Sequence, residues 1–221
     1  GYESSETARG QGGGILIEKG TFKMSTGKII NNTASGRGGG VSCYVRRILG
    51  DVTAEISGGE ISGNSAGISG GGINLYADRT YNASEDELNG DNHLNDVKVK
   101  LTGGILHSNS ANNGGGIYVG INEANSTAEM TIETSYTEST IYDNKATENG
   151  GAIGLSNGTV TVKSGNFSNN TAGNGGAIYL GDGDMSMNNI YIHRNTATKS
   201  GGGVYLANGT LTIKDADKNK I

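Results

Sequence analysis

Apolar residues recur in pairs along this chain, and each pair follows a glycine-rich motif. The motif is three glycines, or two glycines and an alanine, and the apolar residues stand directly after it and two positions further on. An apolar residue at every second position is typical of a short strand with one buried face. The pairs are Ile15/Ile17, Val41/Cys43, Ile73/Leu75, Ile117/Val119, Ile153/Leu155, Ile178/Leu180 and Val204/Leu206.

A second alternating pair follows in most repeats and predicts a second strand. A third short run lies in a motif of one apolar residue, two variable residues, Asn, one further residue and Ala. Each repeat is therefore expected to contain three short strands joined by three turns. The second-strand pairs are Phe22/Met24, Ala54/Ile56, Val99/Leu101, Val160/Val162, Met185/Met187 and Leu211/Ile213.

The asparagine of the third motif is the most regular polar feature of the chain. We expect these side chains to turn inward at a corner, where stacked amides hydrogen-bond to one another and to the turn backbone. This structural ladder would consist of Asn32, Asn64, Asn109, Asn144, Asn170 and Asn195.

The spacing of the glycine motifs identifies a repeat architecture. Successive motifs are 26, 32, 44, 36, 25 and 26 residues apart, so the unit has about 25 residues and the longer intervals contain insertions. Units of this kind bury their apolar residues by stacking on their neighbours. The sequence predicts an all-β fold, a single-stranded parallel β-solenoid or β-helix of about seven coils. We expect a single domain over residues 1–221, with insertions at about 42–52, 76–95 and 120–140.

Composition agrees with this fold and excludes several functions. The 40 glycines permit tight turns, and the absence of proline leaves every strand N–H available for pairing. A net charge of −5 with only 17 Lys and Arg argues against nucleic acid or membrane as a partner. One cysteine excludes an internal disulfide framework. We expect no catalytic residues and no cofactor; the acidic insertion at 76–95 is a weak candidate for calcium, because it lacks EF-hand spacing.

One outward position of the first strand predicts a binding surface. It lies between the two apolar residues of each pair, and three of its seven occupants are Tyr118, Tyr179 and Tyr205. Exposed phenol rings can stack on sugar rings while their hydroxyl groups hydrogen-bond. The alternative is that these rings pack on outward neighbours and support the sheet. Further candidate ligand-binding residues are Asn74 in the same row, Tyr76, Arg79 and Tyr81 around the longest insertion, and the paired Arg46 and Arg47.

The paired motifs resemble the repeats of the chlamydial polymorphic membrane proteins and related adhesin-like surface proteins. The nearest copy is Phe167-Ser168-Asn169-Asn170 followed by Gly175-Gly176-Ala177-Ile178, although most repeats here have Ile or Leu where the family has Phe. The resemblance implies a right-handed parallel β-helix that is secreted or exposed at the cell surface, most commonly for adhesion. It also implies that the chain is a segment of a larger surface protein.

These observations predict a non-catalytic binding or adhesion segment that recognises a glycan or a protein of a host or neighbouring cell. A carbohydrate-active enzyme of the pectate-lyase-like class is an alternative, but the outward row of the first strand contains no Asp or Glu to act as acid or base. A purely structural stalk is a further alternative. Outward pairs such as Thr159/Thr161 suggest an ice-binding face, which charged residues interrupt in other repeats.

Overall fold

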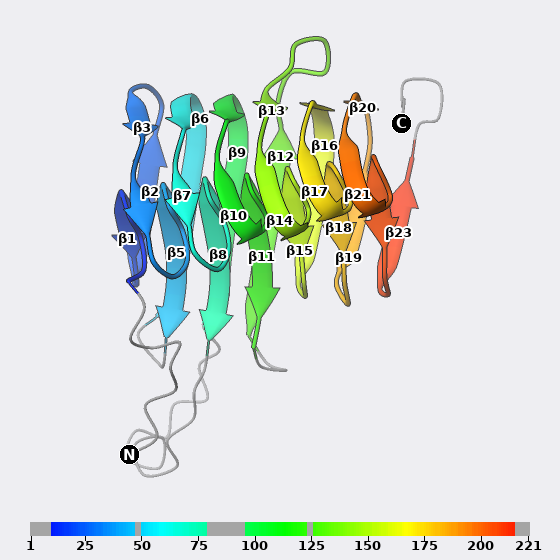
Figure 1. Cartoon of the computed structure of the whole chain (residues 1–221). Helices are drawn as coiled ribbons and strands as arrows, with labels where there is room; N and C mark the ends of the chain where they lie inside the picture. Colours follow the sequence, from blue (N-terminus) through cyan, green and yellow to red (C-terminus); the bar gives the residue numbers. More distant parts are fainter. Residues whose placement is uncertain (1–9, 47–49, 79–95, 123–125, 215–221) are drawn as a thin grey trace.

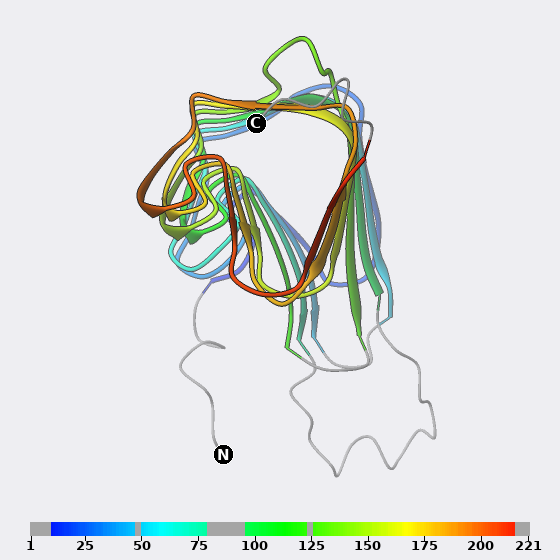
Figure 2. The same cartoon turned by 90° about the vertical axis from the view of Figure 1, so that its right-hand side faces the viewer.

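The computed structural model describes residues 10–46, 50–78, 96–122 and 126–214. In these residues the chain winds into a rod of stacked coils, and three parallel sheets run along its length (Figure 1). Viewed down the rod, the coils superpose on a common outline, with the sheets on its sides (Figure 2). The predicted all-β fold, a parallel β-helix, is confirmed.

Sheet A contains the first predicted strand of each repeat. Every strand begins with the apolar residue after the glycine motif, and neighbouring strands pair without a shift, as Ile15 with Val41 and Ile178 with Val204. In order along the rod, its strands are β1 (Ile15–Ile17), β5 (Val41–Arg46), β8 (Ile73–Asp78), β11 (Ile117–Ile121), β15 (Ile153–Leu155), β18 (Ile178–Leu180) and β22 (Val204–Leu206).

Sheet B contains the second strand of each repeat, and its longest strands continue through a bend into the start of the asparagine motif. Its main strands are β2 (Gly20–Met24), β6 (Val52–Ser62), β9 (Asp96–His107), β12 (Thr127–Glu133), β16 (Thr159–Ser168), β19 (Asp184–Met187) and β23 (Thr210–Ile213). Three short strands pair with the far ends of the long ones: β3 (Lys28–Ile30), β13 (Ile141–Tyr142) and β20 (Ile190–His193).

Sheet C follows the asparagine ladder and leads to the next glycine motif. Its strands are β4 (Thr33–Ala34), β7 (Ser65–Ala66), β10 (Ser110–Asn113), β14 (Lys145–Asn149), β17 (Thr171–Asn174) and β21 (Thr196–Ser200).

The core is a single column of apolar side chains inside the rod. Residues at the same position of successive coils lie in register, so Ile73 contributes to the burial of Val41 on one side and Ile117 on the other. All three are 0% exposed. Because each side chain is covered by its equivalents in the coils above and below, a chain with 33% hydrophobic residues suffices to form a continuous core.

The three positions of the glycine motif have different physical constraints. The first has a positive φ, for example 68° at Gly38, which glycine adopts without strain. The second faces the backbone of the next coil: a Cβ at Gly39 would lie 2.5 Å from the carbonyl oxygens of Gly71 and Ser65. The third position is alanine in two coils, at Ala152 and Ala177, which accommodate a methyl group; in an earlier coil a Cβ at Gly40 would lie 2.7 Å from the carbonyl oxygen of Gly72.

The expected insertions contain more regular structure than the sequence indicated. Residues 42–46 belong to β5 and residues 76–78 to β8. The range 120–140 includes β12, which pairs with β9 and β16 and buries Met130 and Ile132. The correction follows from period-two alternation, which runs through Ala128, Met130 and Ile132 with polar residues between them, so the sequence did carry the signal for this strand. Among the described residues of these ranges, 134–140 form a projecting loop, which stands out above β12 and β13 (Figures 1 and 2).

Candidate binding surfaces

The outward row of sheet A has the register that the repeat predicts. Tyr118 pairs with Asn74 on one side and Gly154 on the other, and Gly154 in turn pairs with Tyr179. Tyr179 pairs with Tyr205. The three tyrosines are each half-buried, so part of every ring remains accessible.

The tyrosine rings form two separate stacks. Tyr179 and Tyr205 lie face to face, with ring centroids 5.7 Å apart and planes 19° from parallel. Tyr118 leans over Gly120 instead, and its ring centroid is 6.4 Å from that of Tyr76. Tyr76 stacks in turn on Tyr44 at 6.0 Å. Tyr179 and Tyr205 thus cover part of each other's faces, whereas the plane of the Tyr118 ring is tilted by 30° from that of Tyr76.

The break between the two stacks lies at Gly154. A Cβ at this position would be 2.8 Å from the backbone nitrogen of Gly114 and 3.4 Å from the carbonyl oxygen of Asn149, so the surrounding backbone leaves no room for a side chain. Beside the break, burial raises the pKa of Tyr179, and the neighbouring Tyr205 adds to the rise. The Tyr179 hydroxyl is therefore a neutral hydrogen-bond donor at physiological pH.

Asn74 and Tyr76 differ from the other candidates because they are buried. Asn74 is 0% exposed, donates from Nδ2 to Ser42 Oγ at 3.3 Å and accepts from Ser69 Oγ at 3.2 Å. Tyr76 lies under the Arg37 guanidinium, whose central carbon is 4.1 Å from the ring centroid. Both residues contribute to the sheet's outer packing.

The other candidates lie outside the described residues: these are Arg47, Arg79 and Tyr81, together with the side chain of Arg46. The backbone of Arg46 pairs with that of Asp78.

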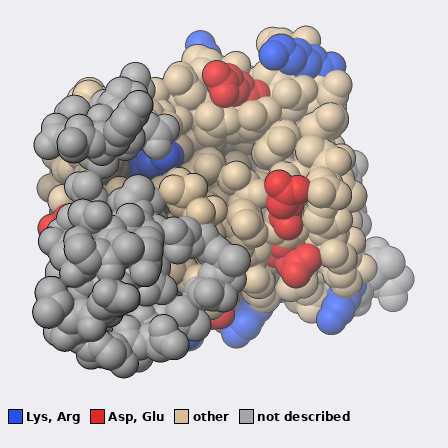
Figure 3. All heavy atoms as spheres, turned by 90° about the horizontal axis from the view of Figure 1, so that it is seen from below, with Lys and Arg blue, Asp and Glu red and all other residues tan. Residues whose placement is uncertain are grey.

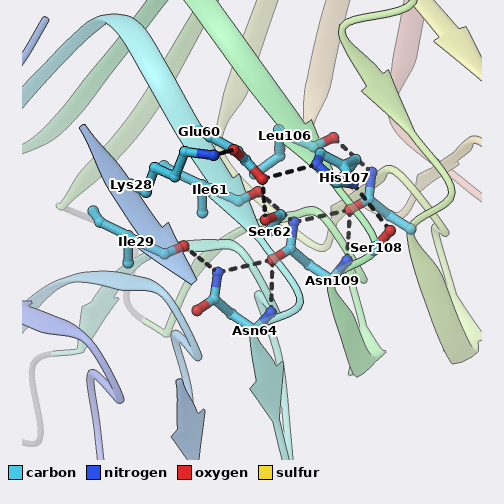
Figure 4. Close-up of polar contacts among 11 residues, drawn as sticks. Lys28, Ile29, Glu60, Ile61, Ser62, Asn64, Leu106, His107, Ser108 and Asn109 are labelled. Carbon is cyan, nitrogen blue, oxygen red and sulfur yellow. Dashed lines mark hydrogen bonds and ion pairs between the residues drawn. The ribbon is translucent and has the colours of Figure 1, made fainter. Parts of the chain in front are cut away.

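A polar cluster lies at the end of sheet B that leads into the asparagine ladder, and it was not identified from the sequence. Figure 4 shows Lys28 and His107 pointing toward the carboxylate of Glu60 from opposite sides. Lys28 Nζ is 2.8 Å from Glu60 Oε2, and His107 Nε2 is 3.2 Å from Glu60 Oε1. Ser62 donates to Glu60 Oε1 at 2.7 Å. The signal was available in the repeat alignment, because Lys28 and Glu60 both stand four residues before a ladder asparagine.

The hydrogen bonds and charges of this cluster keep the Glu60 carboxylate ionised. The hydrogen bond from Lys28, followed by that from Ser62, lowers the pKa of Glu60 to about 2. The same contact raises the pKa of Lys28. Glu60 is therefore ionised and Lys28 protonated throughout the physiological range, and together they join the first two coils.

With Ser108 the cluster superficially resembles the serine–histidine–carboxylate arrangement of hydrolases. His107 Nδ1 is 3.0 Å from Ser108 Oγ, while its Nε2 contacts Glu60. Catalysis by such a relay also requires donors directed at a developing oxyanion. Here the backbone N–H of Ser108 donates to Tyr142 and that of Asn109 donates to the Asn144 side chain. The positive φ of Ser108 recurs at the same corner in other coils, as at Asn31 and Asp143, so it belongs to the turn. Both N–H groups at this turn are therefore already engaged in hydrogen bonds between coils.

The asparagine ladder runs along the corner between sheets B and C. The Nδ2 of each residue from Asn32 to Asn170 donates to the Oδ1 of the next at 3.0–3.1 Å. Each Oδ1 also accepts the backbone N–H of the preceding ladder residue, as Asn170 Oδ1 does from Asn144 at 3.0 Å. The central members Asn64, Asn109, Asn144 and Asn170 are 0% exposed. These amides are saturated and have no capacity for a ligand.

Carboxylates gather in one hollow at the turn between sheets A and B. It has a volume of about 250 Å³, and Glu129, Asp182 and Asp184 are among its lining residues. All three are exposed, so no burial holds one of them protonated as a general acid. On the face seen in Figure 3, acidic side chains form separate patches rather than a continuous row. Among the described residues, no cluster of three His, Cys, Asp or Glu side chains could hold a metal ion.

Comparisons with known proteins agree with this architecture. Residues 138–156 and 164–181 match the Chlamydia polymorphic membrane protein repeat. Each matched segment includes one ladder asparagine and one glycine motif, Asn144 with Gly150 and Asn170 with Gly175. Searches of curated proteins and of solved structures give no match. In the part of the chain that is described, no helix is long and apolar enough to cross a membrane. The described residues thus form a parallel β-helix, and two of its repeats match the Chlamydia polymorphic membrane protein repeat.

Proposed function

We propose that this chain is a non-catalytic binding segment of a surface-exposed or secreted adhesin-like protein, and that its ligand is a glycan. The repeat associates the chain with membrane proteins in general. The observation that carries the proposal is the half-buried tyrosine row of sheet A, in which Tyr118, Tyr179 and Tyr205 lie in register and remain partly accessible along one face.

The arrangement of these rings suits recognition at low conformational cost. The stacked neighbours hold each phenol in place, so ligand binding would immobilise few side chains. Tyr179 and Tyr205 offer two adjacent hydroxyl groups at the spacing of neighbouring coils, which suits the hydroxyl-rich edge of a sugar. The exposed carboxylates near Asp182 have no sheltered acid partner, which supports a binding role over hydrolysis.

The test is a glycan array probed with the wild-type protein and with two triple variants. Replacing Tyr118, Tyr179 and Tyr205 by Ala should abolish glycan binding. Replacing the same three residues by Phe should weaken binding without abolishing it, because the rings stay and the hydroxyl groups are lost. Tyr142→Ala is the matched control, since Tyr142 stacks on His107 on another face. Thermal unfolding of every variant checks that the fold is retained.

Four outcomes would count against the proposal or a part of it. Binding that survives in the triple Ala variant would remove the tyrosine row from the contact surface. Attachment of the protein to cells stripped of glycans would indicate a protein ligand instead. Absence of binding in every format would favour a stalk, and turnover of any polysaccharide by the purified chain would contradict the non-catalytic role.

A further inference from the structure

The dipeptide Asn-Gly occurs six times in this chain, and the fold places its copies in different surroundings. Asparagine is a chemically labile residue, because the backbone nitrogen of the following residue can attack its side-chain amide. Glycine as the following residue leaves this nitrogen open to approach. One copy, Asn89-Gly90, lies outside the described residues; the other five asparagines are Asn113, Asn149, Asn157, Asn174 and Asn208.

Three copies stand at the start of a glycine motif, and their backbone nitrogens are already engaged. Each of these glycines is buried and donates its N–H to a carbonyl oxygen of the next coil. The asparagine side chains also hydrogen-bond to one another in a row. Attack by these nitrogens would break contacts between coils, so the fold protects the three asparagines. The donors Gly114, Gly150 and Gly175 bond to the carbonyl oxygens of Asn149, Asn174 and Ser200 at 2.8–2.9 Å.

Asn157 differs in both respects. It is exposed in the turn between β15 and β16, and its Oδ1 accepts a hydrogen bond of 2.8 Å from the backbone N–H of Gly158. The side-chain carbonyl group therefore already lies beside the nitrogen that can attack it. Holding two reacting groups together removes much of the entropic part of a reaction barrier. Ring closure at Asn157 thus needs no separation of neighbouring coils.

Two other asparagines share only part of this arrangement. Asn208 is also exposed, but its Nδ2 donates to Asp182 Oδ1 at 2.7 Å, which holds the carboxamide in place. Asn188 accepts from the backbone N–H of the next residue at 2.9 Å, as Asn157 does. That next residue is Asn189, whose side chain crowds the nitrogen where Gly158 leaves it open. We expect both asparagines to react more slowly than Asn157.

We propose that Asn157 is a site of spontaneous deamidation in the folded protein. The backbone nitrogen of Gly158 forms a bond to Cγ of Asn157 and gives its proton to water, and Nδ2 leaves as ammonia. Water then opens the cyclic imide at one of its two carbonyl groups, which leaves aspartate or isoaspartate at this position. The reaction requires no enzyme and no oxidant. It goes beyond the proposed binding role and does not depend on it.

The modification would change the charge of the acidic hollow at this turn. Asn157 lines that hollow together with Glu129, Asp182 and Asp184. Deamidation replaces a neutral amide by a carboxylate, so the hollow becomes more negative as the protein ages. The isoaspartate product also passes the main chain through the former side chain and lengthens the turn by one atom.

The test is peptide mapping by mass spectrometry after incubation of the whole chain at 37 °C. In native protein, Asn157 should deamidate about tenfold or more faster than Asn113, Asn149 and Asn174. The rate should rise between pH 7 and pH 9, because the attacking nitrogen must lose its proton. Protein unfolded in guanidinium is the control: there the Asn-Gly copies should react at similar rates, because only the fold distinguishes them.

A variant links the chemistry to the change in charge. Wild-type protein should become more acidic in isoelectric focusing during incubation, and Asn157→Gln should show less of this shift, because glutamine closes the corresponding larger ring slowly. Equal rates at Asn157 and the three motif asparagines in native protein would overturn the proposal. An Asn157 that stays intact in native protein but reacts after unfolding would also overturn it. Reaction at Asn188 as fast as at Asn157 would contradict the role given to Gly158.

Discussion

Asn144 donates from Nδ2 to Oδ1 of Asn170 at 3.1 Å, and its own Oδ1 accepts two hydrogen bonds from Asn109. Nδ2 of Asn144 also donates to the carbonyl oxygen of Leu106. A single fully buried amide thus satisfies polar groups in both neighbouring coils. The ladder fixes the corner of each coil relative to the next, and it keeps the outward faces of sheets A and B in register along the rod.

Replacing Asn144 by Ala should therefore destabilise the protein strongly. The change leaves the buried backbone N–H of Asn109 and the carbonyl of Leu106 without these partners, at a cost on the order of 3 kcal/mol in the free energy of unfolding. Denaturant unfolding followed by circular dichroism measures the loss. Asn149→Ala is the matched control: Asn149 belongs to a shorter, half-buried row with Asn113 and Asn174, and its loss should cost about 1 kcal/mol. Equal costs would contradict the role assigned to the buried ladder.

The second prediction concerns pH and Glu60. The pKa of Glu60 is lowered to about 2 in the folded protein from its ordinary value of 4.5. Because the folded pKa is depressed, the stabilisation from this group is present above pH 4.5 and is lost as the pH falls toward 2. Wild-type protein should thus melt at a higher temperature than Glu60→Gln at pH 7, and this difference should shrink below pH 4.5. A difference that is unchanged at pH 2.5 would refute the assignment.

The third prediction concerns Cys43, which is 0% exposed and in register with Ile17 and Leu75. Burial raises the pKa of its thiol to about 12. Alkylating reagents attack the thiolate, so native protein at pH 8 should not react with iodoacetamide, whereas protein unfolded in guanidinium should react fully. Mass spectrometry of the two samples measures the difference. Rapid labelling of the native protein would show that the core opens at this coil.

The fourth prediction tests the middle glycine of the repeat. Gly39→Ala would place a methyl group against two carbonyl oxygens at 2.5 Å, which the backbone cannot avoid without moving adjacent coils apart. We expect a loss of about 3 kcal/mol or failure to fold. Gly202→Ala is the control at the same motif position, because its Cβ would meet only the Asn195 carbonyl oxygen, at 3.4 Å. Soluble yield and thermal unfolding of the two variants compare them directly; similar behaviour would mean that the coils can separate locally.

The tyrosine row shows the limit of prediction from a single strand pattern. Alternation places Tyr118, Tyr179 and Tyr205 on the outward side, and the pairing of the strands agrees with this. The pattern does not determine how the rings turn. Tyr118 leans toward Tyr76 because Gly120 leaves space beside it, and the row divides at Gly154, where the backbone of Gly114 closes in.

The sequence by itself determined the period, the inward positions and the asparagine ladder, because each depends on local alternation that is repeated in every coil. The interpretation of the sequence missed β12, although Ala128, Met130 and Ile132 alternate with polar residues, because the whole range 120–140 was assigned to an insertion. Only the tertiary structure brought Lys28, Glu60 and His107 together, and only it formed the hollow on sheet B that Lys23, Glu55 and Lys100 line. These groups lie about one or two coils apart in the sequence. Their contacts depend on the lengths of the insertions, on the bulges and on the direction of each side chain. These factors combine only when the coils stack.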